Sequence, residues 1–186
     1  MTRRLTAVIA LVLLAGLARA SAHQAQADPI VVFETEKGTI EFRLYASEAP
    51  KSVEHILALV RKHFYRGLRF HRAERTLVQI GDPLSRDVSR RDYWGSGGSG
   101  TAIGVAEFSK RSHRRGTVGL AHAGVPEYAD SQLYFMKTAS PALDGKHVII
   151  GQVTAGLDVL DRLEVTDRLK VAYVKGEGPP AAAPPS

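Results

Sequence analysis

Arginines and a glutamine interrupt a run that otherwise has the composition of two short β-strands, RFHRAERTLVQIGDP at residues 69–83. Successive side chains of a strand point to opposite faces, so Leu77 and Gln79 share one face and Val78 and Ile80 the other. A strand that only filled a core would alternate apolar and polar residues cleanly. Because the alternation is only partial here, we expect the face of Leu77 and Gln79 to be a binding surface.

Other residues with chemical potential lack the context that their chemistry needs. The loop Gly95–Gly100 fits G-x-G-x-x-G, but it has neither a preceding buried strand nor a following amphipathic helix, so a flexible turn is favoured over a dinucleotide site. The seven histidines include no H-E-x-x-H, and the serines include no G-x-S-x-G. We therefore expect no cofactor and no metal.

Short strands in quantity, with only two helices, must position these residues. Alternation predicts strands at 30–35, 39–46, 118–123, 132–138, 147–153 and 169–174, and further strands around Phe70 and Leu77. Helical spacing of apolar residues predicts a helix from Pro50 to Lys62, with Ser47 as a candidate cap, and a shorter one at 156–164. The pattern predicts a mainly β fold, an antiparallel sheet closed into a barrel, because closure removes exposed edges.

The two ends of the chain differ in composition from the middle. Residues 1–27 combine Arg3 and Arg4, the apolar run LTAVIALVLLAGLA, and small residues suited to cleavage, which indicates a secretory signal. A permanent membrane anchor is the weaker alternative, because the run is shorter than the roughly 20 residues that a spanning helix needs. Residues 28–174 form the predicted domain, and the Pro/Ala-rich residues 175–186 are a predicted disordered tail.

Charge and cysteine content exclude several classes of function. Residues 28–186 carry 22 basic and 19 acidic residues, a net charge of +3, which is too mild for nucleic-acid binding. The densest basic stretch, KRSHRRG at 110–116, lacks interleaved aromatics and is expected to be a solvated loop. Without cysteine the chain has neither disulfides nor thiolate chemistry.

Five segments, taken together, resemble the cyclophilin family of peptidyl-prolyl cis-trans isomerases from about Ile30 to Val174. Their order and rough spacing match the family: FHR at 70–72, Gln79 with Gly81-Asp82, GLAHAG at 119–124, SQLYF at 131–135 and LDGKHVIIG at 143–151. The resemblance implies an eight-stranded antiparallel barrel capped by two helices, with the substrate groove on its outside.

The resemblance also implies roles for individual residues. Arg72 matches the catalytic arginine of the family. The substrate-binding positions, which hold the peptide backbone or line the proline pocket, are Leu77, Gln79, Ala121, His122, Gln132, Tyr134, Leu143 and His147.

Four positions depart from the family pattern. His122 stands where asparagine is common, and Tyr134 replaces a phenylalanine. Thr76 and Ala142 stand where many members carry an aromatic residue and a tryptophan. Losing a large aromatic wall would cost about 1 to 3 kcal/mol of contact with a proline ring, so a shallower pocket is expected.

The functional expectation is an exported, periplasmic or secreted, isomerase that accelerates X-Pro isomerisation in proline-containing peptides and unfolded exported proteins. We expect a monomer that binds no nucleic acid and leaves the membrane once its signal is removed. A cyclophilin-fold binding module or chaperone with little activity is the alternative: Arg72 favours the enzyme, whereas Thr76 and Ala142 favour the module. An adaptor acting through KRSHRRG has less support, because the net charge is small.

Overall fold

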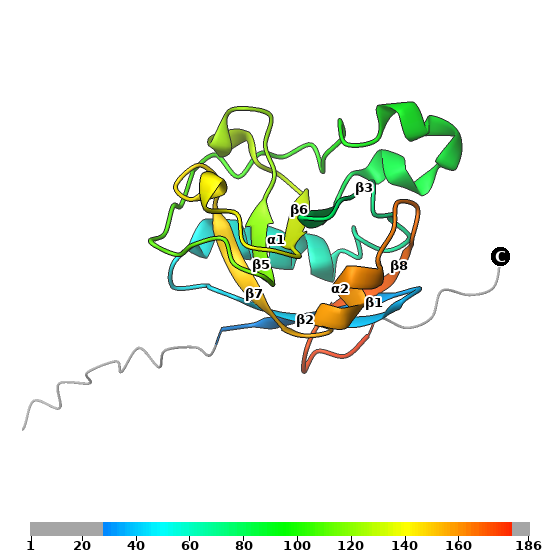
Figure 1. Ribbon diagram of the computed structural model, residues 1–186, viewed down its shortest axis with the longest axis horizontal. Helices are drawn as coiled ribbons and strands as arrows, with labels where there is room; N and C mark the ends of the chain where they lie inside the picture. Colours follow the sequence, from blue (N-terminus) through cyan, green and yellow to red (C-terminus); the bar gives the residue numbers. More distant parts are fainter. Residues whose placement is uncertain (1–27, 180–186) are drawn as a thin grey trace, which may run out of the picture.

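The computed structural model describes residues 28–179, in which a curved antiparallel sheet packs against two α-helices (Figure 1). The strands are β1 (Ile30–Thr35), β2 (Gly38–Leu44), β3 (Arg72–Ala73), β4 (Leu77–Ile80), β5 (Thr117–Leu120), β6 (Leu133–Met136), β7 (Ile149–Ala155) and β8 (Leu169–Val174). The helices are α1 (Pro50–Arg61) and α2 (Leu157–Arg162), with short 3-10 helices η1 (Pro83–Arg86), η2 (Val88–Tyr93), η3 (Pro126–Tyr128) and η4 (Pro141–Leu143). The predicted mainly β fold with two helices is confirmed.

The sheet is open, so the prediction of a closed barrel was wrong. Its strands follow the order β3-β4-β6-β5-β7-β2-β1-β8, and in the described residues no ladder joins β3 to β8. The bridge between Arg69 and Arg168, a few backbone hydrogen bonds and one from Arg69 Nη1 to the Thr166 carbonyl connect residues 67–70 with 166–169, but they form no ladder. The physical reason is length, because β3 has only two residues, and the segment that meets residues 166–169 precedes it.

Helix α1 buries its predicted apolar stripe but is capped differently from the prediction. Val53, Ile56 and Val60 are buried in the main core. The cap position is Ala49 rather than Ser47, and the carboxylate of Glu107 accepts hydrogen bonds from the first free backbone N–H groups of the helix. A side chain far along the chain therefore supplies the cap that a local serine was expected to provide.

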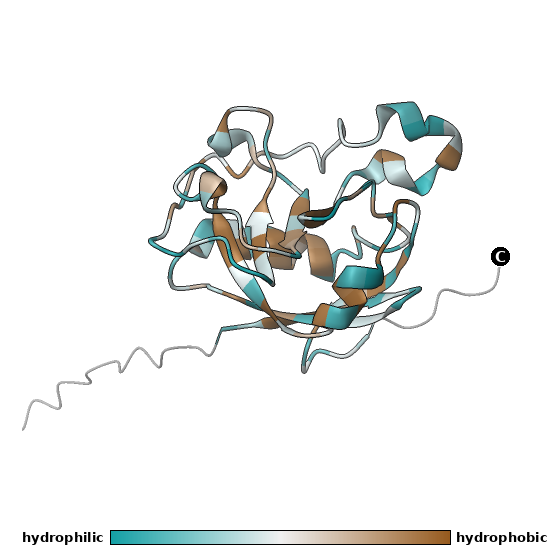
Figure 2. Ribbon diagram, in the orientation of Figure 1, coloured by the Kyte–Doolittle hydropathy of each residue, from teal (hydrophilic) through white to brown (hydrophobic). Residues whose placement is uncertain are grey.

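Four aromatic rings form the centre of the core. Phe33, Phe42 and Phe135 are fully buried, and the Phe42 ring meets the other two edge to face, with centroids 5.0 and 5.2 Å apart. Tyr65 packs beside Phe33 and satisfies its buried hydroxyl by donating to the Ser131 carbonyl at 2.9 Å. Such pairs add about 0.5 to 1.5 kcal/mol each beyond area burial. Figure 2 shows the brown, apolar residues gathered on the strands and helices around this interior.

The two faces of β4 and β6 separate the core from the outer surface. Val78, Ile80, Leu133 and Phe135 belong to the main core. Leu77 and Gln79, and on β6 Tyr134 and Met136, point to the other face, where the apolar members form a second, smaller cluster. The alternation predicted for residues 77–80 is thus confirmed, and it places a distinct surface outside the barrel-like core.

The ends of the domain can be described only in part. Lys175 and Glu177, assigned to the tail, form ion pairs with Glu41 and Arg61. The predicted signal at 1–27 and the last residues, 180–186, lie outside the described residues. Within 28–179, no helix has the length and apolarity to cross a membrane.

Candidate functional site on the outer face of the sheet

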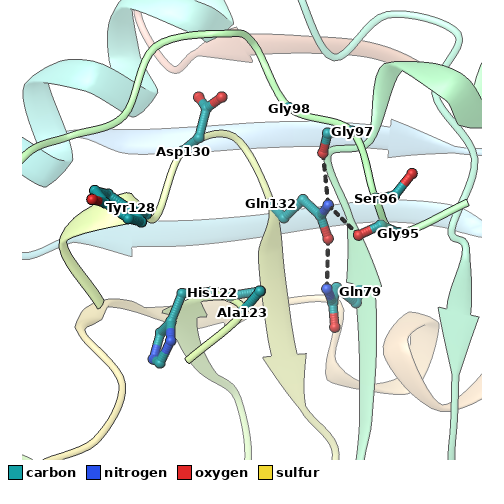
Figure 3. A pocket seen from close by; sticks show the side chains of 11 residues that line it. Gln79, Gly95, Ser96, Gly97, Gly98, His122, Ala123, Tyr128, Asp130 and Gln132 are labelled. Carbon is teal, nitrogen blue, oxygen red and sulfur yellow. Dashed lines mark hydrogen bonds between the residues drawn. The ribbon is translucent and has the colours of Figure 1, made fainter. Parts of the chain in front are cut away.

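A chain of polar side chains begins at Arg72 and runs across three elements. Arg72 on β3 lies opposite Gln79 on β4, and its Nη1 donates to Gln79 Oε1 at 3.4 Å. Gln79 Nε2 donates to Gln132 Oε1 at 2.7 Å. Gln132 Nε2 then donates to the carbonyls of Gly95 and Gly97, at 2.9 and 2.7 Å (Figure 3). The predicted residues Arg72, Gln79 and Gln132 are therefore physically linked, and the link ends on the glycine-rich loop.

Two carboxylates hold this loop, which explains its glycines. Buried Asp82 accepts from the Gly95 amide, and Asp130 accepts from the Gly100 amide at 3.0 Å. A Cβ added at Gly97 would lie 2.3 Å from an Asp82 oxygen, and one at Gly98 would lie 2.5 Å from an Asp130 oxygen. Gly97 and Gly98 therefore permit close approach of the backbone to two carboxylates, and the loop is an anchored wall rather than a flexible turn.

The loop and the end of β5 enclose a groove of about 510 Å³. Four predicted residues line it: Gln79, Ala121, His122 and Gln132. Its other lining residues are Gly95, Ser96, Gly97, Gly98, Ala123, Tyr128 and Asp130 (Figure 3). The sequence did not predict these other lining residues, because a turn and a 3-10 segment carry no periodic pattern of apolar residues.

The remaining predicted residues belong to an apolar cluster beside this groove; its partly exposed surface, at Ala121 and Leu143, is called the hollow below. Leu77 and Tyr134 are buried with Met136 in the smaller cluster, and Ala121 and Leu143 pack against it. Ala121 belongs to both the groove and the hollow, so the two are continuous. Met136 was not among the predicted residues, although it is two positions from Tyr134 and thus on the same face of β6.

Two histidines close one side of the hollow. The rings of His122 and His147 stack with centroids 4.2 Å apart, and His147 meets the Tyr134 ring edge to face at 5.7 Å. His122 Nε2 lies 3.0 Å from the Lys146 carbonyl, and His147 Nδ1 lies 3.3 Å from the Leu120 carbonyl. Burial lowers the pKa of His147, so the neutral ring is favoured at this wall.

Glu74 is an acidic residue of this surface that the sequence analysis did not single out. Its carboxylate accepts from Arg72 Nε at 2.7 Å and from Nη2 at 3.0 Å, and both side chains are about half exposed, at 47%. These hydrogen bonds lower the pKa of Glu74. Because Nε and Nη2 are hydrogen-bonded to Glu74, Nη1 is the guanidinium nitrogen that faces Gln79. Spacing offered a signal, since residues two apart on a strand share a face.

Comparison with known proteins matches residues 30–178 to the family model described as cyclophilin type peptidyl-prolyl cis-trans isomerase. The chain belongs to this family. A probable peptidyl-prolyl cis-trans isomerase of Brucella suis is 34% identical over 155 residues, covering 80% of this chain and 79% of the relative. A peptidyl-prolyl cis-trans isomerase of Helicobacter pylori is 34% identical over 138 residues, covering 72% and 79%.

Solved cyclophilin structures share the fold of this cyclophilin. A Cryptosporidium parvum cyclophilin superposes with a TM-score of 0.70 at 24% identity, covering 80% of this chain and 98% of that one. The same parasite protein crystallised in the presence of the dipeptide Ala-Pro superposes with a TM-score of 0.69 and the same identity. At this identity the likeness concerns the fold.

Both positions that lack the family's aromatic residues lie at the rim of the site in this cyclophilin. Thr76 and Ala142 are exposed, whereas the adjacent Leu77 is buried and Leu143 is partly buried. The apolar side chains of the hollow come from β4, β6 and η4, and the small residues Thr76 and Ala142 precede two of them in the chain. Among residues 28–179, no group of three or more potential metal ligands comes together.

Proposed function

We propose that this isomerase binds an extended X-Pro segment along its outer face, with the proline ring in the hollow and the preceding residues in the adjoining groove. The observation that carries this proposal is the juxtaposition of a cation, Arg72, with an apolar hollow, through the side chain of Gln79. The hollow supplies an apolar site for the ring, and the groove supplies space and polar groups for the chain before it.

Isomerisation of an X-Pro bond requires little of a protein beyond positioning the peptide and a charged group near it. Rotation about an amide has a barrier of about 18 to 20 kcal/mol, because resonance is lost and the nitrogen acquires a lone pair. A fixed cation that meets this lone pair stabilises the transition state more than the ground state. The guanidinium of Arg72 remains charged at physiological pH and carries several donors in one plane, so it suits this role. We assign the catalytic role to Arg72.

The other residues divide into two groups by position. Gln79 and Gln132 hold Arg72 to the loop and face the groove, so they are suited to the substrate backbone. Leu77, Tyr134, Leu143 and His147 surround the hollow, so they are suited to the proline ring. Ala121 and His122 continue from the end of β5 along the groove, which suits pairing with an extended peptide.

A binding module with slow turnover is the second candidate, and two observations favour it. Thr76 and Ala142 leave the mouth of the hollow without large aromatic walls. Glu74 partly neutralises the cation on which catalysis depends. Both features weaken the hold on a proline transition state without preventing peptide binding.

The cellular role that we propose is the folding of exported proteins, outside the cytoplasm. Its support is the composition of residues 1–27, which has the basic start, apolar run and small residues of a secretory signal. Slow X-Pro isomerisation limits the folding of many chains, so an isomerase in the periplasm or outside the cell would have abundant substrates.

Exchange NMR on a short Ala-Pro peptide tests the function directly. The protein from Asp28 onward should accelerate cis-trans interconversion at catalytic concentration. Arg72→Ala should lower the rate at saturating peptide by about 100-fold, the lower end for losing one electrostatic donor to a transition state, because Arg72 is half exposed. In Arg72→Ala the Glu74 carboxylate loses its partner. The double variant Arg72→Ala with Glu74→Ala removes that carboxylate as well and so controls for its unpaired charge. Peptide binding by folded wild type without any acceleration would replace the enzyme with the binding module.

A further inference from the structure

Tyr134, which lines the hollow, carries a hydroxyl that the phenylalanine of the family lacks, and that hydroxyl is bonded inside the protein. Its oxygen lies 2.7 Å from His113 Nε2. The other ring nitrogen of His113, Nδ1, lies 2.7 Å from Asp144 Oδ1, and the backbone N–H of His113 donates to the same oxygen at 2.7 Å. The His113 side chain is fully buried, and Tyr134 is 3% exposed.

We call this hydrogen-bonded chain, Asp144–His113–Tyr134, the relay. Its hydrogen-bond partners indicate where its protons lie. Burial raises the pKa of Tyr134, so the phenol keeps its proton and can donate a hydrogen bond to His113 Nε2. The Nδ1–H then donates to Asp144, whose pKa is lowered by these bonds from His113. Every polar atom between the carboxylate and the phenol thus has a partner. The Tyr134 hydroxyl is thus engaged inside the protein.

The relay connects two walls of the hollow that are separate in the chain. Tyr134 belongs to β6, whereas Asp144 follows Leu143 directly at the end of η4. The space around the ring is tight, because a Cβ at Gly119 would lie 2.3 Å from the Tyr134 hydroxyl. The His113 ring stacks on the Tyr134 ring with an interplanar angle of 22°. Close packing against Gly119 and the hydrogen bond to His113 therefore determine the orientation of the Tyr134 ring.

We propose that His113 is a positioning residue for peptide binding, which holds the Tyr134 and Leu143 walls at the separation that a proline ring requires. The inference rests on the proposed placement of the proline ring in this hollow. With small residues at its mouth, the hollow depends on its remaining walls being correctly placed before the peptide arrives. Binding rather than the chemical step depends on the relay, because Arg72 is held by other partners, Gln79 and Glu74.

A double-mutant cycle between residues 113 and 134 tests the proposal. His113→Leu leaves the phenol and the carboxylate without their partner and should weaken peptide binding about tenfold. Tyr134→Phe breaks the same hydrogen bond and leaves the buried Nε2 of His113 unpaired, so it should weaken binding by a similar factor. The double variant should bind no more weakly than either single variant, because both substitutions break one hydrogen bond. The rate at saturating peptide should stay within about twofold throughout.

NMR titration with the Ala-Pro peptide gives the dissociation constant, and exchange NMR at saturation gives the rate. Tyr173→Phe is the matched control, since Tyr173 on β8 donates its hydroxyl to Glu34 at 3.2 Å away from the groove, and it should change neither quantity. Urea unfolding verifies that each variant is folded. If His113→Leu does not fold, the double variant is compared with Tyr134→Phe alone, and equal affinities are then expected.

Three results would overturn the inference: wild-type affinity in folded His113→Leu, a loss confined to the saturated rate, or a double variant in which the losses of the two single variants add. In the comparison without the single variant, a double variant that binds more weakly than Tyr134→Phe would also overturn it. Failure of the wild type to accelerate exchange would instead refute the isomerase function. The titration would still measure the relay in that case, so the two failures are distinguishable.

Discussion

Replacing Gln132 by glutamate changes one NH₂ group into an oxygen at the junction between the glycine-rich loop and the catalytic side of the sheet. Gln132 Nε2 donates to the carbonyls of Gly95 and Gly97. A carboxylate cannot donate, and its oxygens would repel both carbonyls. The bond from Gln79 survives, because either carboxylate oxygen accepts from its Nε2. The substitution therefore removes the bonds between the loop and residue 132, while Asp82 and Asp130 still hold the loop, and it leaves Arg72 aligned.

The magnitude follows from the number of hydrogen bonds lost. A hydrogen bond in a protein contributes about 1 kcal/mol net, so losing two costs about 2 kcal/mol before any repulsion is added. Such a loss is small beside the roughly 5 to 15 kcal/mol that stabilises a domain, so the protein stays folded. If the loop must be in place for binding, about 2 kcal/mol corresponds to a fall in kcat/KM of roughly 30-fold.

Exchange NMR at several peptide concentrations separates the two kinetic parameters. We expect Gln132→Glu to raise KM and to leave kcat within about threefold of the wild type, since Gln79 keeps its acceptor. Gln152→Glu is the matched control, because Gln152 on β7 also donates to a backbone carbonyl, that of Arg115 at 2.9 Å, outside the groove. Unchanged kcat/KM in a folded Gln132→Glu variant, or an equal loss in the control, would refute the reasoning.

Two further perturbations concern the charges of the site. Glu74→Gln should raise kcat by no more than about fivefold, because an ion pair between half-exposed groups contributes about 0 to 1 kcal/mol and its loss frees the charge of Arg72. Glu177→Gln is the control: it breaks the similar bidentate pair with Arg61 and should have no effect on kcat. A fall in kcat in Glu74→Gln would contradict the prediction and show that Glu74 orients the guanidinium. Because burial lowers the pKa of His147, the unfolded chain binds its proton more readily, so stability is full above the ordinary value of 6.5 and is lost as the pH falls toward the folded pKa. Urea unfolding at pH 5 and pH 7 should show this slope, and His147→Gln should reduce it; a slope unaffected by the substitution would contradict the assignment.

Local periodicity was enough to place most of the fold. The hairpin of β1 and β2, helix α1, and the two faces of β4 could be predicted, because each depends on the spacing of neighbouring side chains. The openness of the sheet could not, because it depends on whether two distant segments, near Arg69 and Arg168, complete a ladder. The cap of α1 was mispredicted for the same reason, since its acceptor, Glu107, lies 55 residues beyond Ser52.

The sequence by itself determined which residues share the outer surface, and a set of motifs in order indicated the family. Arg72, Gln79 and Gln132 were named because they match positions of the family pattern, and backbone geometry placed Gln79 on one face with Leu77. Only the tertiary structure showed what these residues touch: the Glu74 carboxylate on the guanidinium, and the glycine carbonyls that accept from Gln132. Hydrogen bonds reach only about 3 Å, so their partners are decided by how distant segments pack, and spacing along the chain does not encode that distance.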